Sequence, residues 1–333
     1  MERILKAAIL GMGNMGRGHA SSMMKMEGVK LSALCSEPIG DARRFAEEEH
    51  LECQIFDDFD QMLEEAQIDV LYICLPPFAH NGQFEKAAKR GIHIFIEKPI
   101  ALTLKRGRAM AEAAEKNKIV TQVGYQMRFG VAVKKFKEYI ADGTAGRMTL
   151  YMANYECNSL HGPWWRDAKR CGGQVFEQVI HLYDMSLYLM GKASAVNGYV
   201  ANLCHKQVEG YTVEDTSVSN IRFKNGALGS VCGSNCSVKN RWNARFRVIC
   251  ENMTAEFEDQ NHAVFTFTGE EEIRVEEIAA DADCTYEEDR YFIRTVLGEE
   301  KPMADIREGY EGLKLVSAVV SSSEKEGSTV RVE

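Results

Sequence analysis

The first third of the chain alternates short apolar runs with longer segments whose apolar residues recur every three or four positions. The longer, helix-like segments begin near Arg17 and return over residues 42–49, 84–90 and 103–116. The apolar runs between them cover residues 6–13, 29–37, 68–77, 92–99 and 119–129. Strands that alternate with helices in this way are typical of a doubly wound parallel sheet. We therefore predict an α/β domain over residues 1–124.

Beyond about Tyr125 the strands become longer, and their residues alternate between apolar and polar. Such runs cover residues 148–156, 217–233, 245–251 and 263–269, and one of them contains the turn sequence KNG. This pattern is typical of antiparallel strands with one solvated face. Helical segments interrupt the strands after Val131 and over residues 172–191, 289–297 and 309–324. We predict an α+β domain over residues 125–333 with a large, mostly antiparallel open sheet.

Residues 172–191 form the most unusual of these helical segments. Apolar side chains surround it, yet Glu177, His181, Asp184 and Tyr188 interrupt it. At about 100° per residue these four lie within one narrow stripe, and side chains four apart project from the same face. We expect Asp184 either to orient His181 or to cap a neighbouring backbone group, and Tyr188 to be a buried phenol. The pattern predicts a line of ionisable groups on an otherwise buried helix.

Length, charge and cysteine content narrow the possible functions. The chain has 333 residues, which suits two domains, and its 40 basic and 49 acidic residues give a net charge of −9. No long run of Lys or Arg occurs, so we exclude a nucleic-acid partner. We expect no membrane partner, because no apolar stretch reaches the ~18 residues of a membrane span and the first residues lack a secretion-signal pattern. Ten cysteines without regular spacing predict reduced thiols in a cytoplasmic protein.

A glycine-rich loop joins the first predicted strand to the first predicted helix. In ILGMGNMGRGHA the glycines follow the spacing G-x-G-x-x-G. The first glycine permits a tight turn, the second lets the backbone approach a pyrophosphate, and the third permits close helix packing. The amino end of the helix then supplies amide donors. The loop predicts a Rossmann dinucleotide-binding domain, with cofactor contacts at Gly11, Gly13, Asn14, Met15 and Gly16.

The end of the second predicted strand bears on the choice of cofactor. An acidic residue usually binds the adenine-ribose hydroxyls there, but this strand ends in ALCSEP, with Ser36 followed by Glu37. Ser36 would admit a 2′-phosphate paired with Arg43 or Arg44, whereas Glu37 would hold a free diol. The charged residues are equally compatible with plain solvation. We expect Ser36 and Glu37 to contact the cofactor, and we favour NAD over NADP.

Two more predicted strands end in residues suited to ligand binding. The sequence IFIEKP places Glu97 and Lys98 after one strand, and ICLPPFAH places Leu75, Pro76 and His80 after the preceding one. Open α/β sheets bind ligands at the carboxyl ends of their parallel strands. We therefore expect these five residues to contact the cofactor. For His80, a role in the loop or as a helix cap is equally compatible with the sequence.

Together these motifs resemble the Gfo/Idh/MocA oxidoreductases, the family of glucose-fructose oxidoreductase and the inositol dehydrogenases. The resemblance covers essentially the whole chain. It rests on GMGNMG, on EKP, on GYQMRF at the start of the second domain, on the glycine pair before EQVIHLYD, and on a closing GSTVRV strand. It implies a Rossmann domain followed by an α+β domain, a nicotinamide cofactor, and a homodimer or homotetramer formed through the C-terminal sheet.

The resemblance also implies a catalytic centre. In inositol-dehydrogenase-like members the EKP lysine acts with an Asp-x-x-x-His pair, and these positions correspond to Lys98, Glu177 and His181. Glu177 stands where many members have Asp, so its carboxylate reaches one methylene further. From the GYQMRF motif we expect Gln126 to contact the cofactor and Arg128 to contact the substrate.

The loop HGPWWRDAKRCGG, residues 161–173, precedes the polar helix. Aromatic faces and guanidinium groups suit the C–H face and the hydroxyls of a sugar ring. We therefore expect Trp165 and Arg166 to contact the substrate. An interface or core role for one of the tryptophans is equally compatible with the sequence.

These residues predict a nicotinamide-dependent dehydrogenase for a secondary alcohol of a sugar, cyclitol or glycoside. His181 is the expected base, since an imidazole pKa of ~6.5 suits proton transfer near neutral pH. We expect Lys98 to face it across a cleft and to hydrogen-bond the reacting oxygen, and Glu177 to pair with Lys98 or a substrate hydroxyl. Two other functions remain open: redox-neutral glycoside cleavage with a tightly held NAD, and a non-catalytic sensor of nucleotide and sugar.

We expect no metal site. The thiols of Cys232, Cys236 and Cys250 lie in strand-like sequence without paired CxxC spacing. The stripe around His181 offers carboxylate and imidazole ligands. Hydride transfer, however, needs no metal, and the sequence shows no obvious third ligand.

Overall fold

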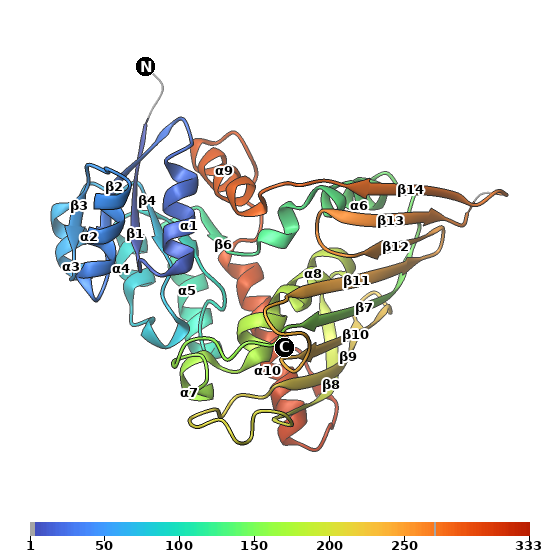
Figure 1. Ribbon diagram of the computed structural model, residues 1–333. Coiled ribbons are helices and arrows are strands. Elements are labelled where there is room, and N and C mark those ends of the chain that lie inside the picture. Colours follow the sequence, from blue (N-terminus) through green and yellow to red (C-terminus); the bar gives the residue numbers. More distant parts are fainter. Residues whose placement is uncertain (1–3, 270) are drawn as a thin grey trace. The chain divides into compact units, whose positions relative to one another are not determined.

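A six-stranded parallel sheet forms the centre of the first part of the chain (Figure 1). The computed structural model describes residues 4–269 and 271–333. The strand order is β3-β2-β1-β4-β5-β6, and all pairs are parallel. This doubly wound order confirms the predicted α/β fold. The strands are β1 (Leu5–Leu10), β2 (Val29–Cys35), β3 (Gln54–Phe56), β4 (Val70–Ile73), β5 (His93–Ile96) and β6 (Thr121–Val123).

Helices complete this first unit. Three of them begin at a side-chain cap, where the side chain of Asp58, Thr103 or Asp283 accepts a hydrogen bond from a backbone amide of the helix's first turn. The helices are α1 (Asn14–Met23), α2 (Ile39–Glu48), α3 (Phe59–Glu65), η1 (Pro77–Ala79), α4 (Gln83–Lys89), α5 (Leu104–Asn117) and α9 (Cys284–Leu297).

The first unit is not continuous in sequence. It contains the residues up to Gly124 and also Asp283–Tyr310. Helix α9 packs against α1, and its Phe292 and Ile293 join the apolar core formed by α1 and the sheet. The predicted division had assigned all residues from 125 onwards to the second domain, whereas these contacts place α9 in the first unit.

The second unit, Tyr125–Ala282 and Glu311–Glu333, is built on a nine-stranded sheet. The order is β14-β13-β12-β11-β7-β10-β9-β8-β15, and only the β7–β10 pair is parallel. The predicted large, mostly antiparallel open sheet is therefore confirmed. Its strands are β7 (Met148–Glu156), β8 (Ala193–Ala201), β9 (Thr216–Phe223), β10 (Leu228–Ser234), β11 (Asn243–Cys250), β12 (Met253–Phe257), β13 (His262–Phe267), β14 (Arg274–Ala279) and β15 (Val330–Arg331).

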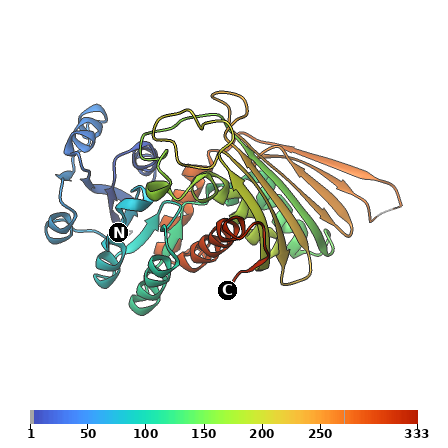
Figure 2. The same ribbon diagram turned by 90° about the horizontal axis from the view of Figure 1, so that it is seen from below.

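Helices cover one face of this sheet (Figure 2). Helix α6 contacts β13 and β14, α8 contacts β7 and β10, and serines near the end of α10 bond to β8. On the other face, Tyr199, Val218 and Leu228 remain exposed. The helices are η2 (Gln126–Phe129), α6 (Val131–Ala141), α7 (Ala168–Cys171), the π-helical turn η3 (Val175–Val179), α8 (Ile180–Met190) and α10 (Ile306–Glu324), which begins in the first unit.

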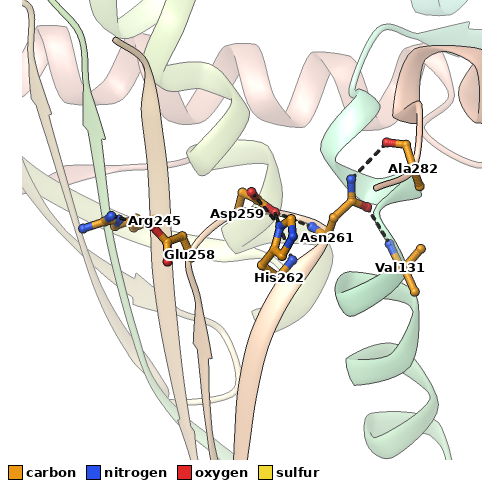
Figure 3. A network of polar contacts seen from close by, with 7 residues as sticks. All are labelled: Val131, Arg245, Glu258, Asp259, Asn261, His262 and Ala282. Atoms are coloured by element: carbon orange, nitrogen blue, oxygen red, sulfur yellow. Dashed lines mark hydrogen bonds and ion pairs between the residues drawn. The ribbon is translucent and has the colours of Figure 1, made fainter. Parts of the chain in front are cut away.

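The turn between β12 and β13 holds the start of α6 in place (Figure 3). The side chain of Asn261 accepts a hydrogen bond from the Val131 amide and donates one to the Ala282 carbonyl, both at 3.0 Å. Asp259 accepts bonds from the amides of Asn261 and His262. One turn thus joins the sheet to the first turn of α6 and to the end of the unit's first segment.

Across the described residues 4–269 and 271–333, we find no helix long and apolar enough to cross a bilayer. All ten cysteines lie within these residues, and no disulfide joins any two of them there.

Candidate active site

The glycine loop between β1 and α1 has the backbone shape that a dinucleotide requires. Gly11 has φ +97°, and a Cβ there would lie 2.6 Å from the Cys74 carbonyl oxygen. A Cβ on Gly16 would lie 1.9 Å from the Gly11 carbonyl oxygen. A Cβ on Gly13 would meet nothing within 4 Å. The first and third glycines are therefore needed for packing, and the second keeps the approach to the amino end of α1 open.

Residues at the end of β2 divide into one buried side chain and several exposed ones. Ser36 is buried, and its hydroxyl accepts a 3.4 Å hydrogen bond from the Met12 amide in the glycine loop. Glu37, Arg43 and Arg44 are exposed. Ser36 thus helps to hold the glycine loop. Contacts of Ser36 and Glu37 with the cofactor remain predictions.

His80 connects the two loops that follow β4 and β5. Its Nδ1 lies 2.7 Å from the Ile100 carbonyl oxygen, and its Nε2 lies 3.2 Å from that of Leu75. A neutral imidazole donates only one hydrogen bond, and burial lowers the pKa of His80. The shorter contact favours a proton on Nδ1. Pro76 lies beside Leu75, and both are half-buried.

The two residues that follow β5, Glu97 and Lys98, differ in burial. Glu97 is 5% exposed, and its Oε1 lies 3.0 Å from Nε2 of His19. Its Oε2 accepts a 3.2 Å hydrogen bond from the Lys98 amide. Lys98 is half-buried. The EKP motif predicted Glu97 and Lys98 as site residues, whereas no motif pointed to His19.

The polar helix differs from the predicted one at its start. Residues Val175–Val179 form a π-helical turn, and α8 begins only at Ile180. A π turn holds more residues than an α turn, so Glu177 does not have the angular position that uniform α-helical spacing gives it. Single π turns inside helices occur frequently at functional sites.

Glu214, which the sequence analysis missed, caps this π turn. Its Oε1 accepts a 2.8 Å hydrogen bond from the Val175 amide. A Cβ on Gly173, whose φ is +111°, would lie 2.3 Å from Glu214 Oε2. Burial raises the pKa of Glu214 to about 7. Gly173, the second glycine of the pair before the helix, therefore makes room for a buried carboxylate with a raised pKa.

The carboxylate of Glu177 is fixed from the preceding loop. Trp165 Nε1 donates a 2.6 Å hydrogen bond to Glu177 Oε2, and the Gln178 side chain donates another to the same oxygen. Trp165 is 1% exposed and packs with Cys171, Tyr211 and Val213. The structure therefore shows a core position for Trp165, and its indole N–H orients Glu177.

Arg166, the residue after Trp165, forms hydrogen bonds that stabilise the loop before the polar helix. Its Nε donates to the Leu160 carbonyl and its Nη2 to the His161 carbonyl. Both bonds are to backbone oxygens within the loop. Substrate contacts by Trp165 and Arg166 remain predictions.

His181 and Asp184 have different surroundings on α8. His181 is 7% exposed, and its ring meets that of Tyr125 edge-on, with centroids 6.4 Å apart. Asp184 forms a two-point ion pair with Arg128: Nε to Oδ2 is 2.9 Å, and Nη2 to Oδ1 is 2.6 Å. Asp184 was expected to orient His181 or to cap a backbone group, and its pairing with Arg128 was not predicted.

Arg128 is a buried cation held on three sides. It is 2% exposed, and its guanidinium lies over the Tyr188 ring at 4.6 Å and over the Tyr125 ring at 5.6 Å. Planar guanidinium groups favour such stacking together with a bidentate carboxylate partner. Gln126, two residues earlier in η2, is half-buried. The contacts of Arg128 with substrate and of Gln126 with cofactor remain predictions.

One group of potential metal ligands occurs in the described residues, and it differs from the three cysteines that the sequence led us to set aside as ligands. Cys204, Asp215 and Cys236 have ligand atoms within 4.8 Å of one another. The two Asp215 oxygens, however, already accept hydrogen bonds from the amides of Leu203, Cys204 and His205 and from the Thr216 hydroxyl. Asp215 therefore closes the loop after β8.

Comparison with known proteins relates these features to a family. The model of an oxidoreductase family with an NAD-binding Rossmann fold matches residues 5–125. The model of the GFO/IDH/MocA C-terminal domain matches residues 133–256. The two models follow one another along the chain, as the sequence resemblance predicted.

Individual proteins show the same relationship. The chain is 31% identical to scyllo-inositol 2-dehydrogenase (NAD(+)) of Bacillus subtilis (strain 168) over 239 residues, which are 71% of this chain and 69% of that protein. It is 26% identical to D-glucoside 3-dehydrogenase of Escherichia coli (strain K12), over 96% of this chain and 95% of that one. Levoglucosan dehydrogenase, solved with NADH and levoglucosan, has the same fold, with a TM-score of 0.90 at 22% identity over 99% of this chain and 100% of that chain.

The resemblance first seen in the motifs is thereby confirmed. The glycine loop and the lysine after β5 lie within the residues that the first family model matches, and the polar stripe lies within those that the second matches. The chain belongs to the Gfo/Idh/MocA oxidoreductases, and its first domain is an NAD-binding Rossmann fold.

Proposed function

We propose that the protein is an NAD-dependent dehydrogenase that oxidises a secondary alcohol of a cyclitol, sugar or glycoside in the cytoplasm. The observation that carries this proposal is that the chain has both a lysine directly after β5, Lys98, and a histidine on α8, His181. The named activities of its relatives, on scyllo-inositol and on D-glucosides, support the substrate class. Ten cysteines that form no disulfide in the described residues support the location.

The glycine loop fits the cofactor. Space around Gly13 is open, and α1 begins there without a side-chain cap, so its first amides are available to a pyrophosphate. A bound nicotinamide would supply the acceptor for the hydride of the carbinol carbon.

The chain's own residues supply the proton chemistry. As the carbinol C–H bond breaks and the C=O bond forms, the hydroxyl proton passes to the imidazole of His181. Lys98 donates a hydrogen bond to the reacting oxygen and stabilises the charge that develops on it. Glu177, already fixed by Trp165, accepts a hydrogen bond from a neighbouring substrate hydroxyl.

The test is the absorbance at 340 nm with NAD⁺ or NADP⁺ and a panel of inositols, hexoses and glycosides. Steady NADH formation with at least one polyol is the expected result. Release of an aglycone from a glycoside without net NADH would instead indicate redox-neutral cleavage. Cofactor and sugar binding with neither reaction would indicate a sensor.

We infer a preference for NAD over NADP. Glu37 is exposed at the end of β2, and Asp41 lies in the first turn of α2. Carboxylates near the adenine ribose repel a 2′-phosphate. We expect a higher kcat/KM with NAD⁺ than with NADP⁺. If kcat/KM is instead tenfold or more higher with NADP⁺, Ser36 with Arg43 or Arg44 would determine the choice of cofactor.

We also propose that the open face of the nine-stranded sheet joins copies of this chain into a homodimer or homotetramer. Tyr199 pairs with Val218 across β8 and β9, and Leu228 follows on β10, so exposed apolar side chains lie on one face of three adjacent strands. Symmetric oligomers commonly bury such a surface against its own copy. The mass in solution should be two or four times 37.4 kDa, and Val218→Glu should reduce it; a monomeric wild-type protein would contradict the proposal.

A further inference from the structure

A fully buried histidine joins two carboxylates in the first unit. His19 on α1 has its Nδ1 2.7 Å from Asp289 Oδ1 and its Nε2 3.0 Å from Glu97 Oε1. The histidine and Asp289 are 0% exposed. The three residues come from α1, from the end of β5 and from α9. None of them was singled out by the sequence for this role.

The geometry suits a charged imidazole. Each ring nitrogen of His19 faces a carboxylate oxygen, and both nitrogens are donors only in the imidazolium form. Burial by itself lowers the pKa of His19, but the charges and hydrogen bonds of Asp289 and Glu97 outweigh burial and raise it well above the ordinary value. Burial raises the pKa of Asp289, while the charge and the hydrogen bond of His19 act in the opposite direction.

Two aromatic rings and a thiol lie close to this cluster. The His19 ring lies against the rings of Tyr72 and Phe95, with centroids 5.3 Å and 4.7 Å away. Burial raises the pKa of Tyr72 on β4 and of Cys74 after it, and the nearby carboxylates, Glu288 among them, raise that of Tyr72 further. Tyr72 and Cys74 therefore remain neutral.

The cluster extends directly to the backbone of Lys98. The second oxygen of Glu97 accepts the Lys98 amide hydrogen bond at 3.2 Å. Gly124 makes room for this carboxylate, because a Cβ there would lie 2.6 Å from Glu97 Oε1. One carboxylate thus binds the imidazolium on one side and the main chain of Lys98 on the other.

We propose that His19 and Asp289 are positioning residues, which hold the Glu97 carboxylate and through it fix the backbone from which Lys98 reaches the substrate. This inference rests on the proposed function only in giving Lys98 a part in the reaction. Because small displacements of a catalytic group cost large factors in rate, His19→Gln should lower kcat about tenfold or more and leave the Kd for NAD⁺ nearly unchanged. Asp289→Asn should have the same effect.

Two measurements separate positioning from general destabilisation. If His19 acts through Lys98, the double variant His19→Gln/Lys98→Met should be no slower than Lys98→Met alone. If the losses in kcat of the two single variants multiply in the double variant, the proposal is wrong. Met62→Ala, a buried core substitution in α3, is the matched control; it should lower the melting temperature while keeping kcat.

A third measurement does not depend on activity. Reductive ¹³C-methylation of the folded protein gives a dimethyl-lysine NMR signal for Lys98, which is assigned by its loss in Lys98→Met. This signal should shift in His19→Gln and in Asp289→Asn but not in Met62→Ala. If no polyol is oxidised but the shift occurs, the proposed function fails and the positioning role stands. An unchanged Lys98 signal would overturn the positioning role.

Discussion

Among single residues, Glu177 shows how the structure sharpens a prediction made from sequence. The pattern placed it beside His181 and left its partner open, and the structure shows that Trp165 Nε1 holds one of its oxygens at 2.6 Å. A carboxylate fixed in this way suits the positioning of a substrate hydroxyl. In the proposed function, proton transfer is assigned to His181.

Glu177→Gln should therefore raise KM more than it lowers kcat. The amide keeps an oxygen that can accept the Trp165 bond but loses the charge, and a hydrogen bond to a charged group is worth about 1.5–3 kcal/mol. We expect KM to rise about tenfold and kcat to fall by less than that. Steady-state kinetics at saturating NAD⁺ measure both constants. A fall in kcat that exceeds the rise in KM would assign Glu177 to the chemical step.

Gly13→Val tests the glycine loop. Because a Cβ at Gly13 meets nothing within 4 Å, the variant should fold normally, while its side chain fills the space that the pyrophosphate needs. We expect titration calorimetry to detect no NAD⁺ binding to a variant with a wild-type circular dichroism spectrum. Retained affinity would place the pyrophosphate elsewhere.

At the scale of elements, pattern analysis identified the doubly wound sheet, the antiparallel sheet and the polar helix because each is a regular repeat. The π turn at Val175–Val179 was not predicted, because the spacing of apolar residues does not reveal one extra residue in a single helical turn. The cap of that turn, Glu214, comes 39 positions after Val175, and no local pattern connects them. His19 did carry a signal: a histidine on the buried side of α1, three positions after Gly16.

The ion pair between α8 and η2 gives a stability prediction. Arg128 and Asp184 are 2% and 1% exposed, and removing one partner of such a pair leaves a buried charge at a cost of about 3–5 kcal/mol. Asp184→Asn should lower the free energy of unfolding by about that amount. Urea denaturation measures it, with the exposed pair variant Glu256→Gln, whose partner is Arg247, expected to change it by less than about 1 kcal/mol.

At the scale of the whole molecule, the sequence predicted both folds but not the path of the chain between the units. Asp283–Tyr310 belongs to the first unit, because α9 supplies Phe292 and Ile293 to its core and Asp289 to His19. Nothing in the spacing of residues 283–310 distinguishes a helix that packs on α1 from one that packs on the second sheet. Only the long-range contacts decide this.

The His19 cluster makes global stability depend on pH. The pKa of His19 is raised in the folded protein, so its contribution is complete below the unfolded value of ~6.5 and is lost as pH rises through the folded value. Between these values the loss is about 1.4 kcal/mol per pH unit. We expect wild-type stability to exceed that of His19→Gln at pH 6.5 and the difference to shrink towards pH 9. A difference that grows with pH would show that the buried imidazole is neutral.

The central claim is that Lys98 and His181 act on the same hydroxyl group of a polyol during NAD-dependent oxidation. The most direct test is a double-mutant cycle of kcat, using a polyol identified at 340 nm and the variants Lys98→Met, His181→Ala and the pair. Each single variant should lower kcat by about 10² or more, with NAD⁺ affinity nearly intact, and the double variant should be scarcely slower than the slower single one. Near-wild-type turnover in a folded His181→Ala protein, or losses that multiply in the double variant, would contradict the account.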